Sequence, residues 1–414
     1  MVPSSWEELE GWLNWRLTRR RFLQISLAAG MAGAAWLAGC ASLGGQGPTT
    51  HPSSPSEGGS DQPLRIGYLP ITDASPLLIA DALGYYKEEG LTAEPPRLFR
   101  SWSQIVEAFQ ARQVNVVHLL MPTAIWLRYA RGFPAKVVAW NHMNGSALTV
   151  RPGIQEVADL AGQTVAVPFW YSIHNVVLQM LLRRAGLRPV LGGDRKPGPD
   201  QVRLIVMAPP DMVPALATGQ IAGFIVAEPF NALAELEGQG RILRFTGDVW
   251  REHACCVVVM HEEDLVQRRG WAAAVVRALV RAQRWMRENR MEAARLLSRE
   301  GKGYLPQPEA AIRKVFDVDL EPYVRTGAIQ HTDWRPMRID FQLYPYPSYT
   351  ARLVLALQET QVEGDTAFLR KLTPDSAARD LVDEGLVREA LAQVGGPRAF
   401  GQPEDLQRQE VIKP

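Results

Sequence analysis

Short apolar runs alternate with amphipathic stretches along the chain from Leu64 onward. Residues 114–120 and 164–167 are mostly apolar at consecutive positions, as in strands that are covered on both faces. Residues 104–111 and 174–185 instead place apolar side chains at helical spacing. Because parallel strands need crossover connections, this alternation predicts an α/β fold built on parallel sheets.

Punctuating residues set the expected bounds of the other elements. Ser75 and Ser101 each precede a helical pattern, so we predict both as N-caps. Further predicted strands are residues 64–69, 136–140, 202–207 and 221–226; further helices are 76–83, 212–218 and 271–289, and residues 189–200 are a predicted Gly/Pro loop. The last helix carries Arg277, Arg281, Arg284 and Arg287 at spacings of three and four, which indicates a solvated basic face.

The N-terminus carries two processing signals in order. Residues 18–24, Thr-Arg-Arg-Arg-Phe-Leu-Gln, resemble the twin-arginine export signal, with Arg19 and Arg20 as its arginines. An apolar stretch of about 13 residues follows, which is shorter than the roughly 20 that a spanning helix needs. It ends in Leu-Ala-Gly-Cys, which resembles a bacterial lipobox with Cys40 as the lipid attachment point. The alternative is an ordinary short buried helix with an incidental cysteine.

These signals predict an exported protein anchored by lipid to the outer face of the cytoplasmic membrane. Residues 1–39 are then a signal peptide, which takes no part in the fold. Residues 40–62 are rich in Gly, Ser, Pro and Thr and predict a flexible tether. About 350 residues remain, enough for two lobes.

Composition excludes several classes of function. The formal net charge is +1, so nothing in the overall charge favours nucleic acid as a partner. The sequence shows no serine elbow, P-loop, dinucleotide fingerprint or HExxH zinc helix. We therefore expect a binding protein with no catalytic residues and no cofactor.

Two of the three cysteines, Cys255 and Cys256, are adjacent. Their Cα atoms are expected about 3.8 Å apart, below the usual disulfide range of roughly 4.4–6.8 Å. A vicinal disulfide would therefore be strained, although an exported protein meets an oxidising compartment. Buried thiols, a disulfide and metal ligands remain the alternatives for this pair.

Several blocks resemble one family when they are taken in order. They are Ile-Gly-Tyr-Leu (66–69), Asp-Ala-Ser-Pro (73–76), Gly-Tyr-Tyr-Lys-Glu-Glu-Gly-Leu (84–91), Ser-Trp (101–102), Val-His-Leu-Leu-Met-Pro (117–122), Asn-Gly-Ser (144–146), Ala-Pro-Pro-Asp-Met-Val (208–213) and Ala-Glu-Pro-Phe (227–230). Their order resembles the nitrate/sulfonate/taurine/bicarbonate group of ABC solute-binding proteins. The resemblance runs from Leu64 to about Glu262.

The resemblance implies a two-lobed periplasmic-binding-protein fold of type II, with C-terminal helices behind it. Residues 64–145 plus 250–414 would form lobe 1 and residues 150–248 lobe 2, with hinges near 146–150 and 247–253. A small solute would bind in the cleft between the lobes. The implied partners are ABC permease and ATPase subunits, and the protein is expected to be a monomer.

Ligands in such folds bind where helices begin beyond strand ends, because free N–H groups point there. The predicted ligand-binding residues are Asp73, Ser101, Trp102, Met121, Asn144, Ser146, Trp170, Tyr171, Ser172, His174, Glu228 and Cys255. The resemblance implies ligand contact for Trp102 and His174, against a packing or capping role. Glu228 is open to ligand binding, cation binding, helix capping or a hinge role.

The chain departs from the nitrate pattern at two places. Nitrate-type relatives place a Lys where residues 253–256 stand, and a Gln where this chain has Ser146. A buried monoanion needs a fixed positive charge, so these changes argue against nitrate. Bicarbonate is disfavoured because no carboxylate cluster for a cation is visible. The aromatic segment 169–175 favours a planar or heteroaromatic organic solute, or a sulfonate.

Two other hypotheses use the same residues differently. His253, Cys255 and Cys256 could hold a soft metal in a metal-binding or redox-sensing lipoprotein. The pyrimidine-synthesising enzymes of thiamine biosynthesis share the implied fold and carry a cysteine-rich segment near iron, so an enzyme of that kind is the second alternative.

Overall fold

The structure is a computed structural model that describes residues 62–193, 196–334 and 337–414. Residues Glu57–Pro414 form one compact unit. The predicted export signal, the lipidation site Cys40 and nearly all of the predicted tether lie outside the described residues. In the described part of the chain, no helix is both long and apolar enough to cross a membrane.

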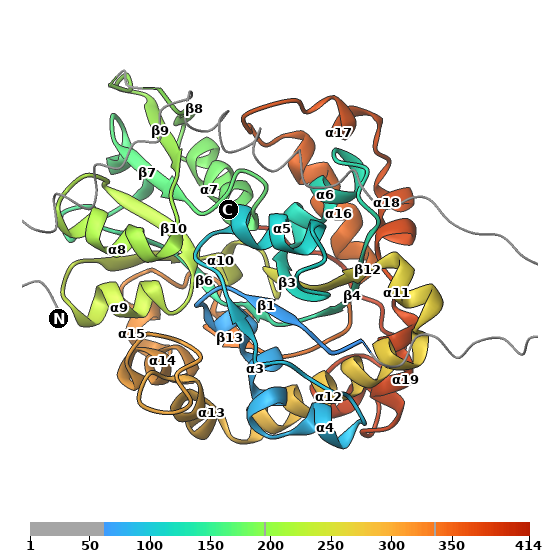
Figure 1. Ribbon diagram of the computed structural model, residues 1–414. Coiled ribbons are helices and arrows are strands. Elements are labelled where there is room, and N and C mark those ends of the chain that lie inside the picture. The colour runs from blue at the N-terminus through green and yellow to red at the C-terminus, as the bar shows by residue number, and fades with distance from the viewer. Residues whose placement is uncertain (1–61, 194–195, 335–336) are drawn as a thin grey trace, which may run out of the picture. The chain divides into compact units, whose positions relative to one another are not determined.

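Two sheets organise the described chain, and both carry parallel strands, which confirms the predicted α/β class (Figure 1). The first sheet has the order β2–β1–β3–β12–β4, where β1 is parallel to β2 and β3, and β12 is antiparallel to β3 and β4. Its strands are β1 Ile66–Tyr68, β2 Arg97–Leu98, β3 Val116–Leu120, β4 Ala135–Trp140 and β12 Cys256–His261.

The second sheet has the order β11–β6–β10–β7–β9–β8. Its strands are β6 Ser146–Val150, β7 Thr164–Val167, β8 Arg188–Leu191, β9 Gln201–Val206, β10 Gly223–Ala227 and β11 Arg241–Phe245. Strands β8, β9, β7 and β10 run parallel, whereas β6 is antiparallel to both neighbours. A small pair, β5 Met143–Asn144 with β13 Ile339–Asp340, lies where the chain passes between the sheets.

Helices surround both sheets. In the first two thirds of the chain they are α3 Ser75–Ala82, α4 Tyr85–Glu88, α5 Trp102–Gln110, α6 Met121–Tyr129, α7 Ile173–Arg184, α8 Pro209–Ala217, α9 Phe230–Leu236, α10 Thr246–Val249 and α11 Glu262–Gln267. The remainder are α12 Arg269–Glu288, α13 Arg290–Leu297, α14 Glu309–Phe316, α15 Glu321–Arg325, α16 Pro347–Gln358, α17 Ala367–Lys371, α18 Pro374–Leu381 and α19 Gly385–Ala392. Short 3₁₀ turns are η1 Thr72–Ala74, η2 Val157–Leu160, η3 Thr332–Trp334 and η4 Pro397–Phe400.

Two local predictions need correction, and a third is confirmed. Ser75 is not an N-cap: it is the first residue of α3, and its hydroxyl donates to the Thr72 carbonyl (2.6 Å), because η1 runs directly into the helix. Ser101 does cap α5 by accepting from the Gln104 N–H. The predicted loop 189–200 contains β8, whose Pro189 is tolerated because β8 is an edge strand.

The basic face of α12 is partly solvated, as predicted, but its arginines also contact neighbouring elements. Arg277 Nε lies 2.7 Å from Glu89 Oε2, and Arg281 pairs with Glu88. Glu88 is the last residue of α4, and Glu89 follows it. Arg287 lies 3.5 Å from Asp340. The arginines therefore join α12 to neighbouring elements, which a single-helix pattern cannot reveal.

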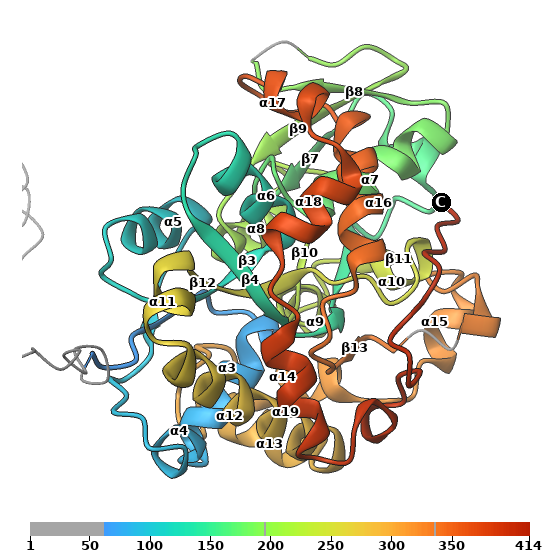
Figure 2. The same cartoon turned by 90° about the vertical axis from the view of Figure 1, so that its right-hand side faces the viewer.

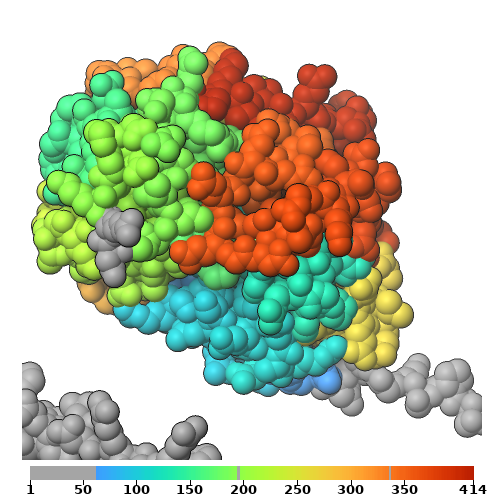
Figure 3. Space-filling model, turned by 90° about the horizontal axis from the view of Figure 1, so that it is seen from above, coloured from blue at the N-terminus to red at the C-terminus, as the bar shows by residue number. Residues whose placement is uncertain are grey.

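The C-terminal segments contact elements of both sheets. α18 packs against α6, which follows a strand of the first sheet, whereas α14 packs against α9 of the second (Figure 2). The Gln361 carbonyl accepts from Asn175 and Gln179 of α7, so residues just after α16 lie against the second sheet's helix (Figure 3). The prediction placed all of residues 250–414 in lobe 1; these contacts tie part of that stretch to the elements predicted as lobe 2.

Candidate functional site

Buried polar side chains gather where the two sheets meet. From the first sheet's side, Asp73 lies in η1 beyond β1, His142 follows β4, and Cys255 and Cys256 open β12. From the second, Ser146 begins β6 and His174 lies in the first turn of α7. Each is at most 1% exposed. This is the position at which α/β folds bind ligands, because strand ends and helix starts converge there.

Asp73 and His142 form the centre of this cluster. His142 Nε2 lies 2.9 Å from Asp73 Oδ2, and the same nitrogen accepts from the Cys256 N–H at 3.2 Å. One ring nitrogen serves only one of these contacts at a time, so the close approach to Asp73 requires a proton or another cation between the two atoms. Gly145, at φ 78°, makes room for the ring: a Cβ there would lie 2.9 Å from His142 Nδ1.

Burial and charge shift the pKa of both groups. Burial raises the pKa of Asp73 to about 7, although His142 acts in the opposite direction. Burial alone would lower the pKa of His142, but the Asp73 carboxylate, with Cys255, raises it to about 10. The pair therefore holds at least one proton at neutral pH.

The two cysteines are free thiols that point to the same side. The backbone bends at Cys255 and enters β12 at Cys256, so neighbouring side chains do not alternate as they would in a regular strand. Their Sγ atoms are 3.9 Å apart. Burial opposes ionisation of Cys255, yet the Cys256 thiol, His174 and His142 hold the pKa of Cys255 well below its usual range. Burial, reinforced by Cys255, raises the pKa of Cys256.

His174 connects the second sheet to the cysteines. Its Nε2 lies 2.9 Å from Ser146 Oγ and 3.7 Å from Cys255 Sγ. Ser146 and Cys255 were both predicted as ligand contacts, and the structure places both beside Nε2 of His174. In the described chain Nδ1 of His174 has no hydrogen-bond partner.

Unpaired polar atoms concentrate in this region. Of the described residues that carry a buried side-chain atom without a hydrogen-bond partner, seven lie in or beside this cluster, whereas others, such as Asp264 and Thr350, lie elsewhere; the seven are Asp73, Trp102, His118, Asn141, His142, His174 and His253. A buried polar group without a partner costs free energy, and folded proteins satisfy most such groups. So many in one place indicate a binding site rather than ordinary packing.

Two histidines beside the cluster, His118 and His253, each form a hydrogen bond with a residue outside it. Nε2 of His118 accepts from the Leu69 N–H (2.8 Å), and its ring lies 5.4 Å from that of the predicted ligand residue Trp102. His253 does not join the cysteines, contrary to the soft-metal hypothesis. Its Nε2 bonds to Thr246 Oγ1 (2.8 Å), whose hydroxyl donates on to the Ser146 carbonyl, so His253 serves the crossover between the sheets.

Several residues that were predicted as ligand contacts form hydrogen bonds that hold the local structure. Ser101 and Ser172 each cap a helix. The Met121 N–H donates to the Cys255 carbonyl (3.0 Å), and Asn144 Nδ2 donates to the Met337 carbonyl (3.0 Å). These residues hold backbone near the cluster.

Glu228 is held in an ion pair. Its Oε1 lies 2.7 Å from Arg338 Nε and Oε2 accepts from the Ala232 N–H, with both side chains fully buried. Of the roles that the sequence left open, the structure shows helix capping and pairing with Arg338.

The aromatic side chains of segment 169–175 point elsewhere. Trp170 Nε1 donates to Glu363 Oε2 (3.1 Å). Tyr171 stacks on Trp126 with ring centroids 5.8 Å apart, and it lies near Phe368. The structure thus places these rings against α6 and the C-terminal segment.

Sequence reasoning did not select His142, His118 or Cys256 as ligand contacts. His118 stands alone inside an apolar strand, and His142 lies in a polar crossover, so each carried a weak signal. Neither sequence pattern indicates which residue, distant in the chain, the histidine contacts.

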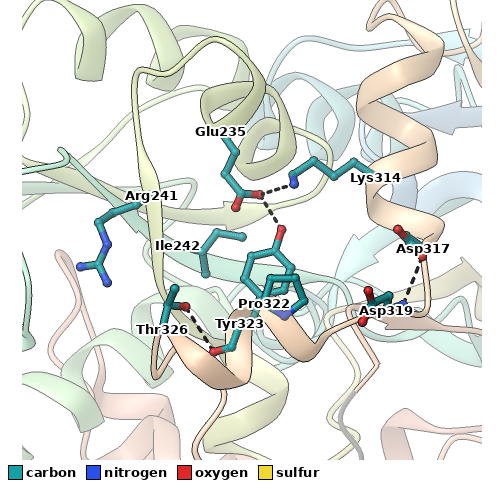
Figure 4. Close-up of a pocket in the computed structure, with 9 residues that line it drawn as sticks. All are labelled: Glu235, Arg241, Ile242, Lys314, Asp317, Asp319, Pro322, Tyr323 and Thr326. Carbon is teal, nitrogen blue, oxygen red and sulfur yellow. Dashed lines mark hydrogen bonds and ion pairs between the residues drawn. The ribbon is translucent and has the colours of Figure 1, made fainter.

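Two surface hollows of the described chain lie away from the cluster, whereas a third, smaller one is bordered by Met143 and Asn144, next to His142 in the chain. One of about 300 Å³ is bordered by α9, β11, α14 and α15 (Figure 4). There Tyr323 donates to Glu235 Oε2 (3.0 Å), and Lys314 Nζ lies 3.8 Å from the same oxygen. Its central charges are therefore already paired with each other.

Residues 57–298 match the model of the NMT1-like family. The chain belongs to this family. This NMT1-like protein is 25% identical over 318 residues to the nitrate/nitrite binding protein NrtA of Nostoc, covering 68% of this chain and 70% of that one. It is 30% identical over 234 residues to the nitrate import ATP-binding protein NrtC of Synechocystis, covering 53% of this chain but only 34% of the relative.

A solved structure shows the fold. The periplasmic nitrate-binding protein NrtA from Synechocystis superposes with a TM-score of 0.66 at 20% identity, covering 84% of this chain and 93% of that one. The NMT1-like protein therefore has the periplasmic-binding-protein fold, as the resemblance implied.

Proposed function

We propose that the chain is the extracytoplasmic solute-binding component of an ABC importer. The observation that carries this proposal is the enclosed cluster of unpaired polar groups between the two sheets. In a two-lobed binding protein such groups find their partners in a captured ligand. The relationship to NrtA supports a binding role, and the match to NrtC supports partnership with ATPase and permease subunits.

The role is binding rather than catalysis. The central groups are closed off from solvent on all sides. Relatives named as binding and import proteins agree with that role.

The ligand meets a polar centre. Asp73, His142, His174 and the two thiols face one another, whereas Trp170 and Tyr171 are engaged elsewhere. This arrangement favours a small polar ligand over the planar organic solute that segment 169–175 suggests. The absence of a Lys at 253–256 still weighs against nitrate.

Location and assembly belong to the same proposal. Arg19 and Arg20 direct export, and Cys40 carries the lipid that holds the protein at the outer face of the cytoplasmic membrane. The protein works as a monomer that delivers solute to the permease.

Ligand capture is tested by mass spectrometry of small molecules and ions released from natively purified protein. A thermal-shift screen of sulfonates, heteroaromatic compounds, oxyanions and metal ions should find a class that raises the melting temperature, because binding stabilises the folded state by mass action. A protein that releases nothing and responds to none of these classes would contradict solute capture.

A further inference from the structure

Four side chains with metal-ligating atoms meet at the centre of the site. Asp73, His142, Cys255 and Cys256 each offer one ligand atom, and these atoms all lie within 4.8 Å of one another. All four residues are fully buried. They come from segments far apart in the sequence, so the fold itself assembles the group.

A second observation points to a cation. The Asp73 carboxylate is fully buried, and among the described residues no backbone N–H donates to it. Its close polar contacts are His142 Nε2 at 2.9 Å, which needs a proton or a cation between the two atoms, and the Cys256 thiol. An ionised carboxylate in such a place is costly unless it is paired or coordinates a metal.

The spacing of the thiols fits one tetrahedral ion. With metal–sulfur bonds of about 2.3 Å, two sulfur ligands of a zinc ion lie about 3.8 Å apart. The observed Sγ–Sγ distance is 3.9 Å. The contact between His142 and Asp73 needs to widen by only a few tenths of an ångström, since nitrogen and oxygen ligands of such an ion lie about 3.3 Å apart.

The types of ligand atom determine which metal ion fits the site. Two sulfurs exclude Ca²⁺ and Mg²⁺, which take oxygen ligands. Imidazole and carboxylate beside them suit a borderline cation such as Zn²⁺ more than the softer Cu⁺. We propose that Asp73, His142, Cys255 and Cys256 bind a late first-row divalent cation of the Zn²⁺ type, as cargo or as the anchor for the solute.

The two sheets have different parts in this site, and here the inference rests on the proposed function. All four ligands belong to the first sheet and the turns that follow its strands. From the second sheet's side, His174 approaches Cys255 from outside, and Ser146 contacts His174. The first lobe would bind the ion, and closure would add His174 as a partner of the Cys255 sulfur.

Cobalt provides the direct test. The full-length protein is reduced, stripped with a chelator and titrated with Co²⁺, then with Zn²⁺. We expect one ion per chain, thiolate-to-cobalt charge-transfer absorption, the visible bands of tetrahedral Co²⁺, and displacement by Zn²⁺. Absence of the charge-transfer band in folded protein would overturn the proposal without any mutation.

Substitutions assign the ligands. Loss of an outer partner lowers metal affinity roughly 10–100-fold, so Asp73→Asn and the double change Cys255→Ser, Cys256→Ser should lower it by more than about 100-fold. His261→Gln is the matched control, because His261 is buried at the far end of β12. If the cysteine variant, shown to be folded by circular dichroism, binds Zn²⁺ like the wild type, bound metal is adventitious.

The outcomes separate this inference from the proposed function. If no metal binds but an organic solute or oxyanion raises the melting temperature, the metal site is wrong and solute capture stands. If neither metal nor solute binds, both proposals fall.

Discussion

Arg338 is a charged residue near the site whose side chain is fully buried. Its guanidinium contacts Glu228 at 2.7 Å and Glu235 at 3.1 Å, and Tyr323 OH lies 2.7 Å from the same guanidinium. The cationic group thus joins the exit of β10 to α9 and α15. Because it is fully buried, its partners depend on it to avoid an uncompensated negative charge.

Arg338→Met should therefore lower the free energy of unfolding by about 3–5 kcal/mol. Urea unfolding followed by circular dichroism measures this change. The double change Glu228→Gln, Arg338→Met should lose less, because the fully buried carboxylate is neutralised together with the loss of its partner, while Glu235 keeps Lys314 at 3.8 Å. Arg325→Met, which removes an exposed partner of Glu321, should cost no more than about 1 kcal/mol. A loss for Arg338→Met as small as that of Arg325→Met would contradict the pairing argument.

At the scale of elements, α18 is tied to α6 by one carboxylate. Asp380 accepts from Arg128 Nε (2.6 Å) and from Tyr129 OH (2.8 Å). The hydrogen bond from Arg128 lowers the pKa of Asp380 from 3.8 to about 2. A depressed pKa means that the ionised form is favoured in the folded state.

The stabilisation from Asp380 should be present above pH 4 and disappear as the pH falls from about 4 to about 2. Asp380→Asn should therefore be less stable than the wild type at pH 6, and the difference should vanish near pH 2. Thermal unfolding across this pH range measures it. Asp375→Asn, an exposed change in the same helix, should leave the profile unchanged. A stability difference for Asp380→Asn that does not vary with pH would argue against the ion pair.

Whole-molecule features divide into those that local sequence encodes and those that it does not. Residues 164–167 are as apolar as a covered strand requires, and the structure has β7 at Thr164–Val167. The meeting of Asp73 with His142 and Cys256 depends instead on the pairing of β12 with both β3 and β4, which no local pattern states. The same holds for the partners of the α12 arginines and for the bend at Cys255. His174 and Ser146 were both predicted as ligand contacts, and the structure places Ser146 Oγ 2.9 Å from His174 Nε2.

The proposed lipid anchor determines where the whole molecule is located, and substitution of Cys40 tests it. Cys40→Ser should leave the folded protein intact outside the cytoplasmic membrane but move it from the membrane to the soluble extracytoplasmic fraction. Arg19→Lys, Arg20→Lys should instead retain it inside the cell. Immunoblots of cell fractions measure both. A Cys40→Ser protein that stays with the membrane would exclude lipid attachment at that residue.

The contact between Gln361 and α7 has a consequence for how the elements of the two sheets can move apart. Gln361 accepts from Asn175 and Gln179 through its carbonyl, and its own N–H donates to Gln179 Oε1 (2.9 Å). Meanwhile α18, farther along the same stretch, stays with α6. The stretch from Gln361 to α18 thus bridges α7 of the second sheet and α6 of the first, so any movement that separates these two helices has to break the contacts of Gln361 or those of Asp380.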